Sequence, residues 1–239
     1  MQQPVTLVTG SSRGIGAATA KLLADSGHLV IGTGRHRPIN PPGPFFEIDF
    51  VDPKATAEGL SQIVEEYEID HLINNAGLSQ SRSLLETSVE DMDLHYSVNL
   101  RAAVQCAQAV VPSMQIKGRG RIVNVSSRVV LGRTERTPYA ASKAGLLSLT
   151  RCWALELAAF GITINTIAPG PIRTELFDRN HPLGSEAYEE LLKTVPGKRF
   201  GTPEEVAEPI AFLLSDGAAY INGQVIYVCG GASIGAAPL

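Results

Sequence analysis

The sequence is poor in cysteine and has no pattern of metal ligands. Its three cysteines, Cys106, Cys152 and Cys229, are scattered and odd in number, so we expect reduced thiols in a cytoplasmic protein. The five histidines share no metal-ligand spacing, and we therefore expect no metal site. These absences exclude a disulfide-stapled domain and a zinc module.

Long apolar runs and an excess of positive charge are also missing. No run reaches the roughly 20 apolar residues that a membrane-spanning helix needs. The first residues lack the basic, apolar and small-residue order of a signal peptide. The net charge of -4 argues against nonspecific nucleic-acid binding. We expect neither a membrane nor a nucleic acid among the partners.

Short apolar segments alternate with helical patterns along all 239 residues, of which 44% are apolar. The predicted strands are 5–9, 29–33, 45–48, 69–73, 121–125, 162–167 and 225–228. The predicted helices are 14–25, 53–67, 89–116, 138–160 and one that begins at 203. Most of these strands are continuous apolar runs, as expected when helices cover both faces of a sheet. The fold class predicted is α/β, a single-domain Rossmann-type doubly wound parallel sheet of about seven strands.

Two segments interrupt this alternation. Residues 36–44 contain four prolines, which predicts a loop or stub instead of a helix between the second and third strands. Residues 173–200 carry prolines and glycines between regular elements, and we interpret them as a small helical lid with flexible ends. Neither segment is a linker, so residues 1–239 are expected to form one domain.

A glycine-rich turn follows the first strand. Gly10, Gly14 and Gly16 give the spacing G-x-x-x-G-x-G between a strand and a helix. Such glycines let the backbone approach a pyrophosphate, and the helix N-terminus supplies free N–H groups. The pattern favours a dinucleotide site, and an ordinary strand-to-helix turn is the alternative.

The end of the second strand indicates which dinucleotide binds. An NAD site usually carries an acidic residue there, but this strand leads into Arg35 with no acid nearby. Arg35, with Arg13 in the glycine-rich turn, suits the 2′-phosphate of NADP(H). We therefore favour NADP(H) over NAD(H), and two solvated surface arginines are the alternative.

Tyr139 and Lys143 lie four residues apart on a predicted helix and thus on one face. An ammonium beside a phenol lowers the phenol pKa, and such a tyrosine can exchange a proton with a carbonyl or alcohol oxygen. Ser126 and Ser127 end the fifth strand, at the sheet edge where ligands bind in parallel sheets. A surface pair and simple turn chemistry are the alternatives.

Together these motifs resemble the short-chain dehydrogenase/reductase family over nearly the whole chain. The motifs that carry the resemblance are Thr9 to Gly16, Asn74-Asn75-Ala76-Gly77, Asn99, Ser126-Ser127, the Y-x-x-x-K of Tyr139 and Lys143, and Pro169-Gly170. Residues 199–207 and the last strand are most similar to 3-oxoacyl-[acyl-carrier-protein] reductase-like members.

The resemblance implies a catalytic set. Tyr139 would be the general acid/base, and Lys143 would lower its pKa and hold the nicotinamide ribose. Ser127 would polarise the substrate oxygen, with Ser126 as the second choice, and Asn99 would hold a water linked to Lys143.

The resemblance also implies the cofactor contacts. Asn75, Ala76 and Gly77 would line the adenine-ribose side, and Asp49 would meet the adenine amine. Around the nicotinamide carboxamide it would place Pro169, Gly170, Ile172 and Thr174. The pyrophosphate would lie on Gly10, Ser12, Arg13, Gly14, Ile15 and Gly16. Asn75 as a support of the sheet and Pro169-Gly170 as a turn are the alternatives.

The function expected is an NADPH-dependent carbonyl reductase that converts a ketone or 3-oxoacyl group to a hydroxyl. An NAD(P)-dependent alcohol dehydrogenase working in oxidation and a noncatalytic dinucleotide-binding sensor are the alternatives. The substrate would be a small carbonyl or alcohol compound, with thioester-carried groups included. Arg128, Arg133 and Arg136 suit an acidic carrier protein, a coenzyme A thioester or a carboxylate, or form a solvated loop. The resemblance further implies a homotetramer or homodimer.

The sequence departs from the family pattern in two places. The proline-rich segment 36–44 replaces the helix that usually follows the second strand. Cys229 stands where the family often has aspartate, near the end of the last strand. The first departure bears on the adenine pocket and on the role of Arg35, whereas the second leaves the chemistry unchanged.

Overall fold

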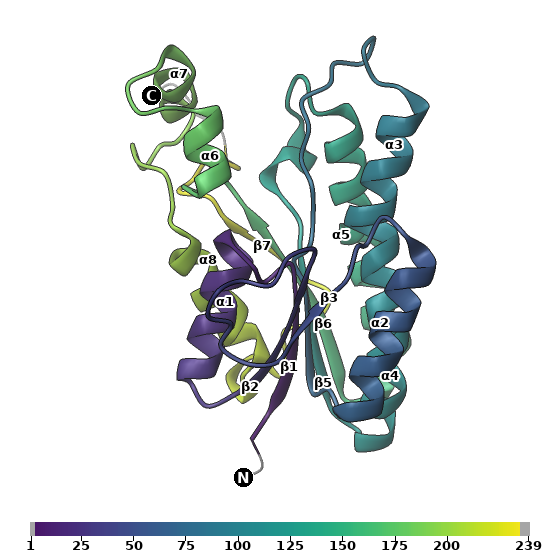
Figure 1. Ribbon diagram of the computed structural model, residues 1–239. Coiled ribbons are helices and arrows are strands. Elements are labelled where there is room, and N and C mark those ends of the chain that lie inside the picture. Colours follow the sequence, from purple (N-terminus) through teal and green to yellow (C-terminus); the bar gives the residue numbers. More distant parts are fainter. Residues whose placement is uncertain (1–2, 235–239) are drawn as a thin grey trace.

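Seven parallel strands form one sheet in the order β3-β2-β1-β4-β5-β6-β7 in the computed structural model, which describes residues 3–234 (Figure 1). The strands are β1 (Val5–Thr9), β2 (Leu29–Gly34), β3 (Phe45–Glu47), β4 (His71–Asn74), β5 (Gly120–Val125), β6 (Ile162–Pro169) and β7 (Val225–Val228). Chain order reverses between β1 and β4, which opens a crevice at the carboxyl ends of these strands. The predicted fold class is confirmed.

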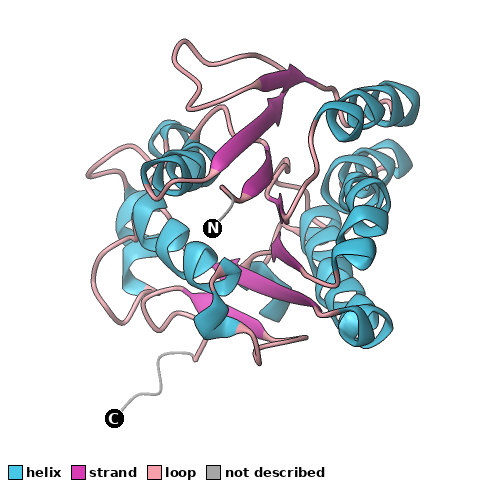
Figure 2. Cartoon of the chain, turned by 90° about the horizontal axis from the view of Figure 1, so that it is seen from below, coloured by secondary structure: helices cyan, strands magenta, loops and turns pink. Residues whose placement is uncertain are grey.

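Helices cover both faces of the sheet, as Figures 1 and 2 show from two directions. One layer contains α1 (Gly14–Asp25) and α8 (Pro203–Leu214). The other layer contains α2 (Pro53–Glu66), α4 (Ala102–Lys117) and α5 (Thr137–Leu157). No helix among residues 3–234 has both the length and the apolar character for crossing a bilayer.

Adjacent residues of each central strand serve opposite faces of the sheet. Leu7 and Leu72 pack into the core beneath α2 and α4, whereas Val8 and Ile73 pack beneath α1 and α8. All four side chains are fully buried. Both faces therefore need apolar residues, which is why the strands are continuous apolar runs instead of alternating ones.

The proline-rich segment contains no helix, as its prolines predict. The chain leaves β2 and returns to β3 with the Gly32 amide donating to the Pro44 carbonyl at 2.8 Å. A Cβ atom on Gly43 would lie 2.2 Å from the Val30 carbonyl oxygen, so only glycine allows this close return. The crossover from β2 to β3 is thus a loop that lies against its own strand.

The predicted helix 89–116 is interrupted. Its residues form α3 (Val89–Tyr96), a π-helical turn η1 (Ser97–Arg101) and α4. Such turns insert a residue into the helical ladder and often occur at functional sites. Asn99 lies in this turn, and its buried amide makes the side-chain hydrogen bonds described below.

The predicted lid is built from two short helices, α6 (Glu175–Asn180) and α7 (Glu186–Lys193). The two ends of the lid lie side by side, since Ile172 and Gly201 form a parallel bridge to one another. The Arg173 amide donates to the Gly201 carbonyl at 2.8 Å, and the Gly201 amide donates to the Pro171 carbonyl at 3.1 Å. Backbone hydrogen bonds thus hold the two ends of the lid together, and their flexibility stays a prediction.

A buried histidine makes the fold sensitive to acid. His71, at the start of β4, is 3% exposed, and its pKa is lowered to about 4 by burial and by the neighbouring His28. Between pH 4 and pH 6.5 the His71 imidazole is protonated in the unfolded chain but neutral in the folded chain. The free energy of unfolding therefore falls as the pH drops from 6.5 towards 4. The difference between these pKa values corresponds to about 3 kcal/mol.

We predict that His71→Leu reduces the loss of unfolding free energy between pH 7 and pH 4.5, as measured by urea denaturation. His36→Leu, at an exposed histidine, is the matched control and should behave as the wild type. Parallel pH curves for His71→Leu and the wild type would contradict the assignment.

Candidate active site

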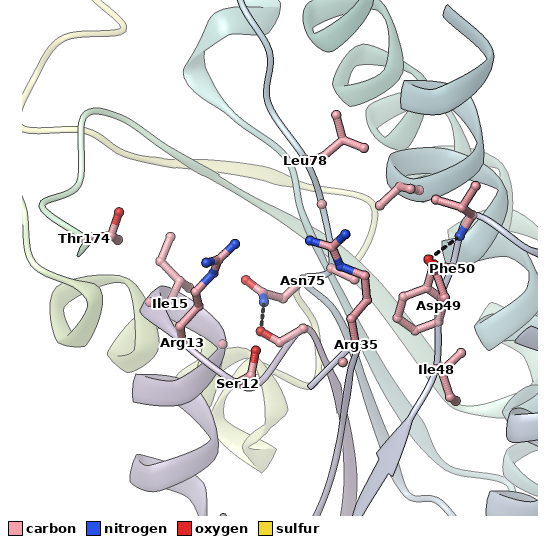
Figure 3. Close-up of a pocket in the computed structure, with 18 of the residues that line it drawn as sticks. Ser12, Arg13, Ile15, Arg35, Ile48, Asp49, Phe50, Asn75, Leu78 and Thr174 are labelled. Carbon is pink, nitrogen blue, oxygen red and sulfur yellow. Dashed lines mark hydrogen bonds between the residues drawn. The ribbon is translucent and has the colours of Figure 1, made fainter. Parts of the chain in front are cut away.

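A cavity of about 490 Å³ opens at the crevice between β1 and β4 (Figure 3). Residues from the ends of β1, β2 and β4 and from the start of α1 line it. The predicted cofactor residues that line it are Gly10, Ser12, Arg13, Gly14, Ile15, Gly16, Arg35, Asp49, Asn75, Ala76, Gly77 and Thr174.

A second cavity of about 320 Å³ adjoins the first, since Ile15, Gly77 and Thr174 belong to both walls. Its wall includes the remaining predicted residues except Asn99, namely Ser127, Tyr139, Lys143, Pro169, Gly170 and Ile172. Residues from widely separated segments of the chain therefore meet along one continuous groove.

The glycine-rich turn has the geometry of an anion site. A Cβ atom on Gly16 would lie 2.2 Å from the Gly10 carbonyl oxygen, so only glycine allows α1 to start this close to β1. Arg13 is the N-cap of α1, yet its side chain makes no capping hydrogen bond, and the first turn contains no acidic residue. The first N–H groups of α1 are therefore free to bind a phosphate in the larger cavity.

Two arginines flank this anion site. Arg13 and Arg35 are exposed, and Figure 3 shows their guanidinium groups pointing into the cavity towards one another. Within the described part of the chain, neither guanidinium has a carboxylate within 4.0 Å. Asp49, on the same side, uses one carboxylate oxygen to accept from the Val51 amide at 3.1 Å. The residues present fit a dinucleotide that carries an additional phosphate.

Asn75 supports the sheet as well as lining the cavity. Its side-chain amide donates to the carbonyl oxygens of Thr9 at 2.9 Å and Gly10 at 3.1 Å. The Thr9 hydroxyl accepts from the backbone amides of Asn75 and Ala76, both at 3.0 Å. The ends of β1 and β4 are thus tied together directly beneath the glycine-rich turn.

The two serines after β5 have different partners. The buried Ser126 hydroxyl donates to the Lys143 carbonyl at 2.8 Å and so joins β5 to α5. The Ser127 hydroxyl accepts from the Val129 amide at 3.3 Å and shares the cavity wall with the Tyr139 phenol. Only Ser127 therefore presents its hydroxyl beside the tyrosine in the cavity.

Burial governs the pKa values of Tyr139 and Lys143. Burial raises the pKa of Tyr139 above its ordinary value, while the neighbouring Ser127 hydroxyl and the Arg136 charge oppose this rise. The Lys143 ammonium donates to the Val125 carbonyl at 2.7 Å, and burial lowers its pKa to about 8. The expected lowering of the Tyr139 pKa by Lys143 is absent from this structure, because Lys143 is directed at β5 and Arg136 supplies the nearby charge.

Asn99 lies behind the groove instead of in its wall. Its amide accepts from the Leu78 amide at 2.8 Å and donates to the Leu78 carbonyl at 3.0 Å and the Ser142 hydroxyl at 2.9 Å. A Cβ atom on Gly77 would lie 3.1 Å from the Lys143 ammonium and 3.2 Å from the Asn99 amide oxygen. Asn99 therefore fixes the 76–78 segment against α5 and above Lys143.

Comparisons with known proteins show the family to which the chain belongs. A family model described as enoyl-(acyl carrier protein) reductase matches residues 10–233. The 3-oxoacyl-[acyl-carrier-protein] reductase FabG of Thermotoga maritima is 38% identical and covers 97% of this chain and 98% of its own. The chain belongs to the short-chain dehydrogenase/reductase family.

Other members of the family differ in the substrates that their names state. FabG of Escherichia coli is 36% identical over 95% of this chain and 96% of its own. The ligand-free aldohexose dehydrogenase of Thermoplasma acidophilum superposes with a TM-score of 0.91 at 31% identity, covering 100% of this chain and 96% of its own. A putative 2-deoxy-D-gluconate 3-dehydrogenase of Agrobacterium tumefaciens with bound NADP has a TM-score of 0.88 at 32% identity, with 97% of each chain covered.

This short-chain dehydrogenase/reductase is thus an oxidoreductase of a family that binds nicotinamide dinucleotides. The structure also adds wall residues that motifs do not reveal. In the larger cavity these are the apolar residues Ile48, Phe50, Leu78, Leu94 and Val98. Ile48 and Phe50 flank the predicted Asp49. Their place directly after the end of a strand is the feature of the sequence that could have identified them as wall residues.

Lys143 carries a stability cost that follows from its burial. Its pKa of about 8 in the folded chain, against 10.5 ordinarily, corresponds to about 3 kcal/mol at pH values below 8. The folded chain binds fewer protons than the unfolded chain between these values, so stability rises with pH from about 8 to 10.5.

We predict that Lys143→Met loses catalytic activity but unfolds at a temperature no lower than the wild type at pH 7. Its advantage should shrink as the pH rises above 8, because the wild-type lysine then becomes neutral. Calorimetric melting from pH 6 to pH 10 measures this difference. A variant that is less stable at pH 7 and insensitive to pH would show that the ammonium stabilises the fold.

Proposed function

We propose that the protein is an NADPH-dependent carbonyl reductase that converts a ketone or 3-oxoacyl group to a hydroxyl. The observation that supports this most is the common wall of Ser127, Tyr139 and Lys143 in a cavity that continues over the uncapped N-terminus of α1. The activity in the names of the FabG relatives, reduction of 3-oxoacyl groups on a carrier protein, agrees with this reaction class.

When NADPH is bound, it supplies the hydride that reduces the carbonyl carbon. The hydroxyls of Ser127 and Tyr139 would hold the carbonyl oxygen, and Tyr139 would donate its proton to that oxygen as the C–O double bond becomes single. Because burial raises the pKa of Tyr139, the phenol carries the proton it must donate at neutral pH. Arg136 and the N-terminus of α5 then stabilise the phenolate left behind.

Lys143 and Asn99 complete the proposed catalytic set. Lys143 would hold the nicotinamide ribose, and its pKa of about 8 lets it exchange protons near neutral pH. Asn99 would hold a water that connects Lys143 with solvent. The lid, α6 and α7, would close over the substrate, since Phe177 and Leu191 are part of the wall of the smaller cavity.

We predict that Tyr139→Phe lowers kcat by at least about 100-fold without weakening NADPH binding, because the proton donor is lost and the anion site is untouched. Tyr220→Phe, at a fully exposed tyrosine, is the matched control. NADPH oxidation with a panel of ketones and fluorescence titration of NADPH provide the two readouts. Unchanged kcat in Tyr139→Phe would reject the proposed acid.

We propose further that Arg13 and Arg35 select NADP(H) over NAD(H) through the 2′-phosphate. A charge-assisted hydrogen bond contributes about 1.5–3 kcal/mol, so Arg35→Ser should weaken NADPH binding roughly 10–100-fold and leave NADH binding nearly unchanged. Arg37→Ser removes the same charge two residues away, outside the cavity wall, and should preserve the preference. Equal weakening of NADPH and NADH by Arg35→Ser would reject this role.

We also propose a homotetramer or homodimer in which α5 takes part. The α5 side chains of Cys152 and Leu155 are exposed, as is Phe160 just beyond the helix. Trp153, by contrast, packs against the main core. An exposed apolar strip along a long helix favours burial against a second copy.

A further inference from the structure

Three arginines line the smaller cavity together with Ser127 and Tyr139. Arg128, Arg133 and Arg136 all come from the segment that joins β5 to α5. No aspartate or glutamate belongs to the wall of this cavity in the described part of the chain. The region in which the substrate oxygen would be reduced is therefore strongly positive.

The arginine charges lie close enough to act on one another and on the tyrosine. The pKa of Arg133 is lowered by burial and by the charges of Arg136 and Arg128, and the exposed Glu135 only partly offsets this. The Arg136 charge also lowers the pKa of Tyr139. An anion bound between Arg133 and Arg136 would relieve their repulsion and would lie near the reacting hydroxyl.

In the described part of the chain, only one of these guanidinium groups donates a hydrogen bond of ordinary length to the protein. Arg128 donates to the Ala232 carbonyl at 3.1 Å, which anchors the segment after β7. Arg136 reaches the Ser79 hydroxyl only at 3.5 Å. Within residues 3–234, none of the three has a carboxylate within 4.0 Å. Arg133 and Arg136 are thus available to a ligand, whereas Arg128 has a structural partner.

The backbone presents these arginines in a fixed position. Arg82 and Arg136 form a parallel bridge, in which the Arg82 amide donates to the Glu135 carbonyl at 3.0 Å. Arg136 is also the N-cap of α5, and its side chain makes no capping hydrogen bond. The guanidinium of Arg136 therefore extends from a rigid position three residues before Tyr139.

Apolar residues complete the wall. Val129 and Ile172 belong to it, and the lid contributes Phe177 and Leu191. The lid follows β6, whereas the arginine segment precedes α5 on the other side of the opening (Figure 1). A molecule that suits both sets of residues has an apolar body and one anionic group.

We propose that the natural substrate is a keto acid, a ketone with an apolar body whose carboxylate binds Arg133 and Arg136 while its carbonyl oxygen lies between Ser127 and Tyr139. This proposal rests on the proposed carbonyl reduction and names the substrate class of the same site. An acidic carrier protein would need charges on the outer surface alone, whereas Arg136 and the exposed Arg133 also share a cavity wall with the catalytic hydroxyls.

Two measurements test the proposal on the whole protein. Calorimetric titration of the NADP⁺ complex compares 4-phenylbutanoate with 4-phenylbutanamide, which has the same shape without the charge. NADPH oxidation compares 4-oxo-4-phenylbutanoate with its methyl ester. We expect the acid to bind more tightly than the amide and to react with a higher kcat/KM than the ester, each by roughly 10–100-fold.

Arg133→Met should reduce this discrimination at least roughly tenfold, mainly through the acid, because one charge-assisted pair is lost. Arg136→Met should reduce the ratio of acid to ester similarly, on top of a lower kcat for both substrates, because Arg136 also stabilises the Tyr139 phenolate. Arg119→Met is the matched control, since Arg119 pairs with Asp216 at 2.9 Å and lies just before β5, at the opposite edge of the sheet. It should preserve the discrimination in full.

Equal binding of acid and amide by the wild type would overturn the keto-acid proposal, and reduction of neutral ketones in the same experiment would leave the proposed reductase standing. Discrimination that survives in both arginine variants would also overturn it. If the arginine variants lose activity only with 3-oxoacyl groups on a carrier protein or coenzyme A, the arginines bind the carrier and the keto-acid proposal is wrong. Acid-selective binding without oxidation of NADPH by any carbonyl would support the carboxylate site and contradict the reductase.

Discussion

The tie between the ends of β1 and β4 is the constraint on which the rest of the groove depends. Thr9 and Asn75 exchange backbone and side-chain hydrogen bonds across the point where strand order reverses. The same contact brings Ala76 within 2.9 Å of where a Cβ atom on Gly10 would lie. The glycine-rich turn thus packs between two strand ends, and α1 begins beside the crevice.

Buried polar groups extend this support beneath the catalytic side. Asn74 donates to Asn124 at 2.9 Å, Asn124 donates to Thr150 at 2.8 Å, and Thr150 bonds Thr166 at 2.7 Å. These residues belong to β4, β5, α5 and β6, and all are buried. A buried polar chain of this kind fixes the position of α5 more strictly than apolar packing alone, because its members need defined partners. Tyr139 and Lys143 take their positions from that helix.

Much of this arrangement can be predicted from the sequence. Chemical motifs such as the glycine spacing and Ser127 follow strand ends, and a parallel sheet brings strand ends to one edge. The prolines of 36–44 likewise exclude a helix by covalent geometry alone. Strand bounds shift by a few residues, as with β4, because hydrogen-bonded register and not apolarity decides where a strand ends.

Features that depend on three-dimensional neighbours could not be predicted in this way. Asn99, in the π-helical turn, is hydrogen-bonded to Leu78, which is distant in sequence, so no local pattern predicts this contact. The direction of the Lys143 ammonium towards Val125 and the charge of Arg136 beside Tyr139 are likewise tertiary facts. The roles of the individual catalytic and cofactor residues remain predictions on a geometry that brings all but Asn99 into one groove.

The bridge between Ile172 and Gly201 makes the lid a module that leaves and re-enters the fold at one point. Because its two ends already meet there, a replacement of different length costs little additional loop entropy. The cofactor groove is built mainly from other segments, whereas Phe177 and Leu191 reach only the smaller cavity. Changes in α7 can therefore reshape the smaller cavity while the larger cavity and the sheet stay the same, so the two cavities can evolve separately in this scaffold.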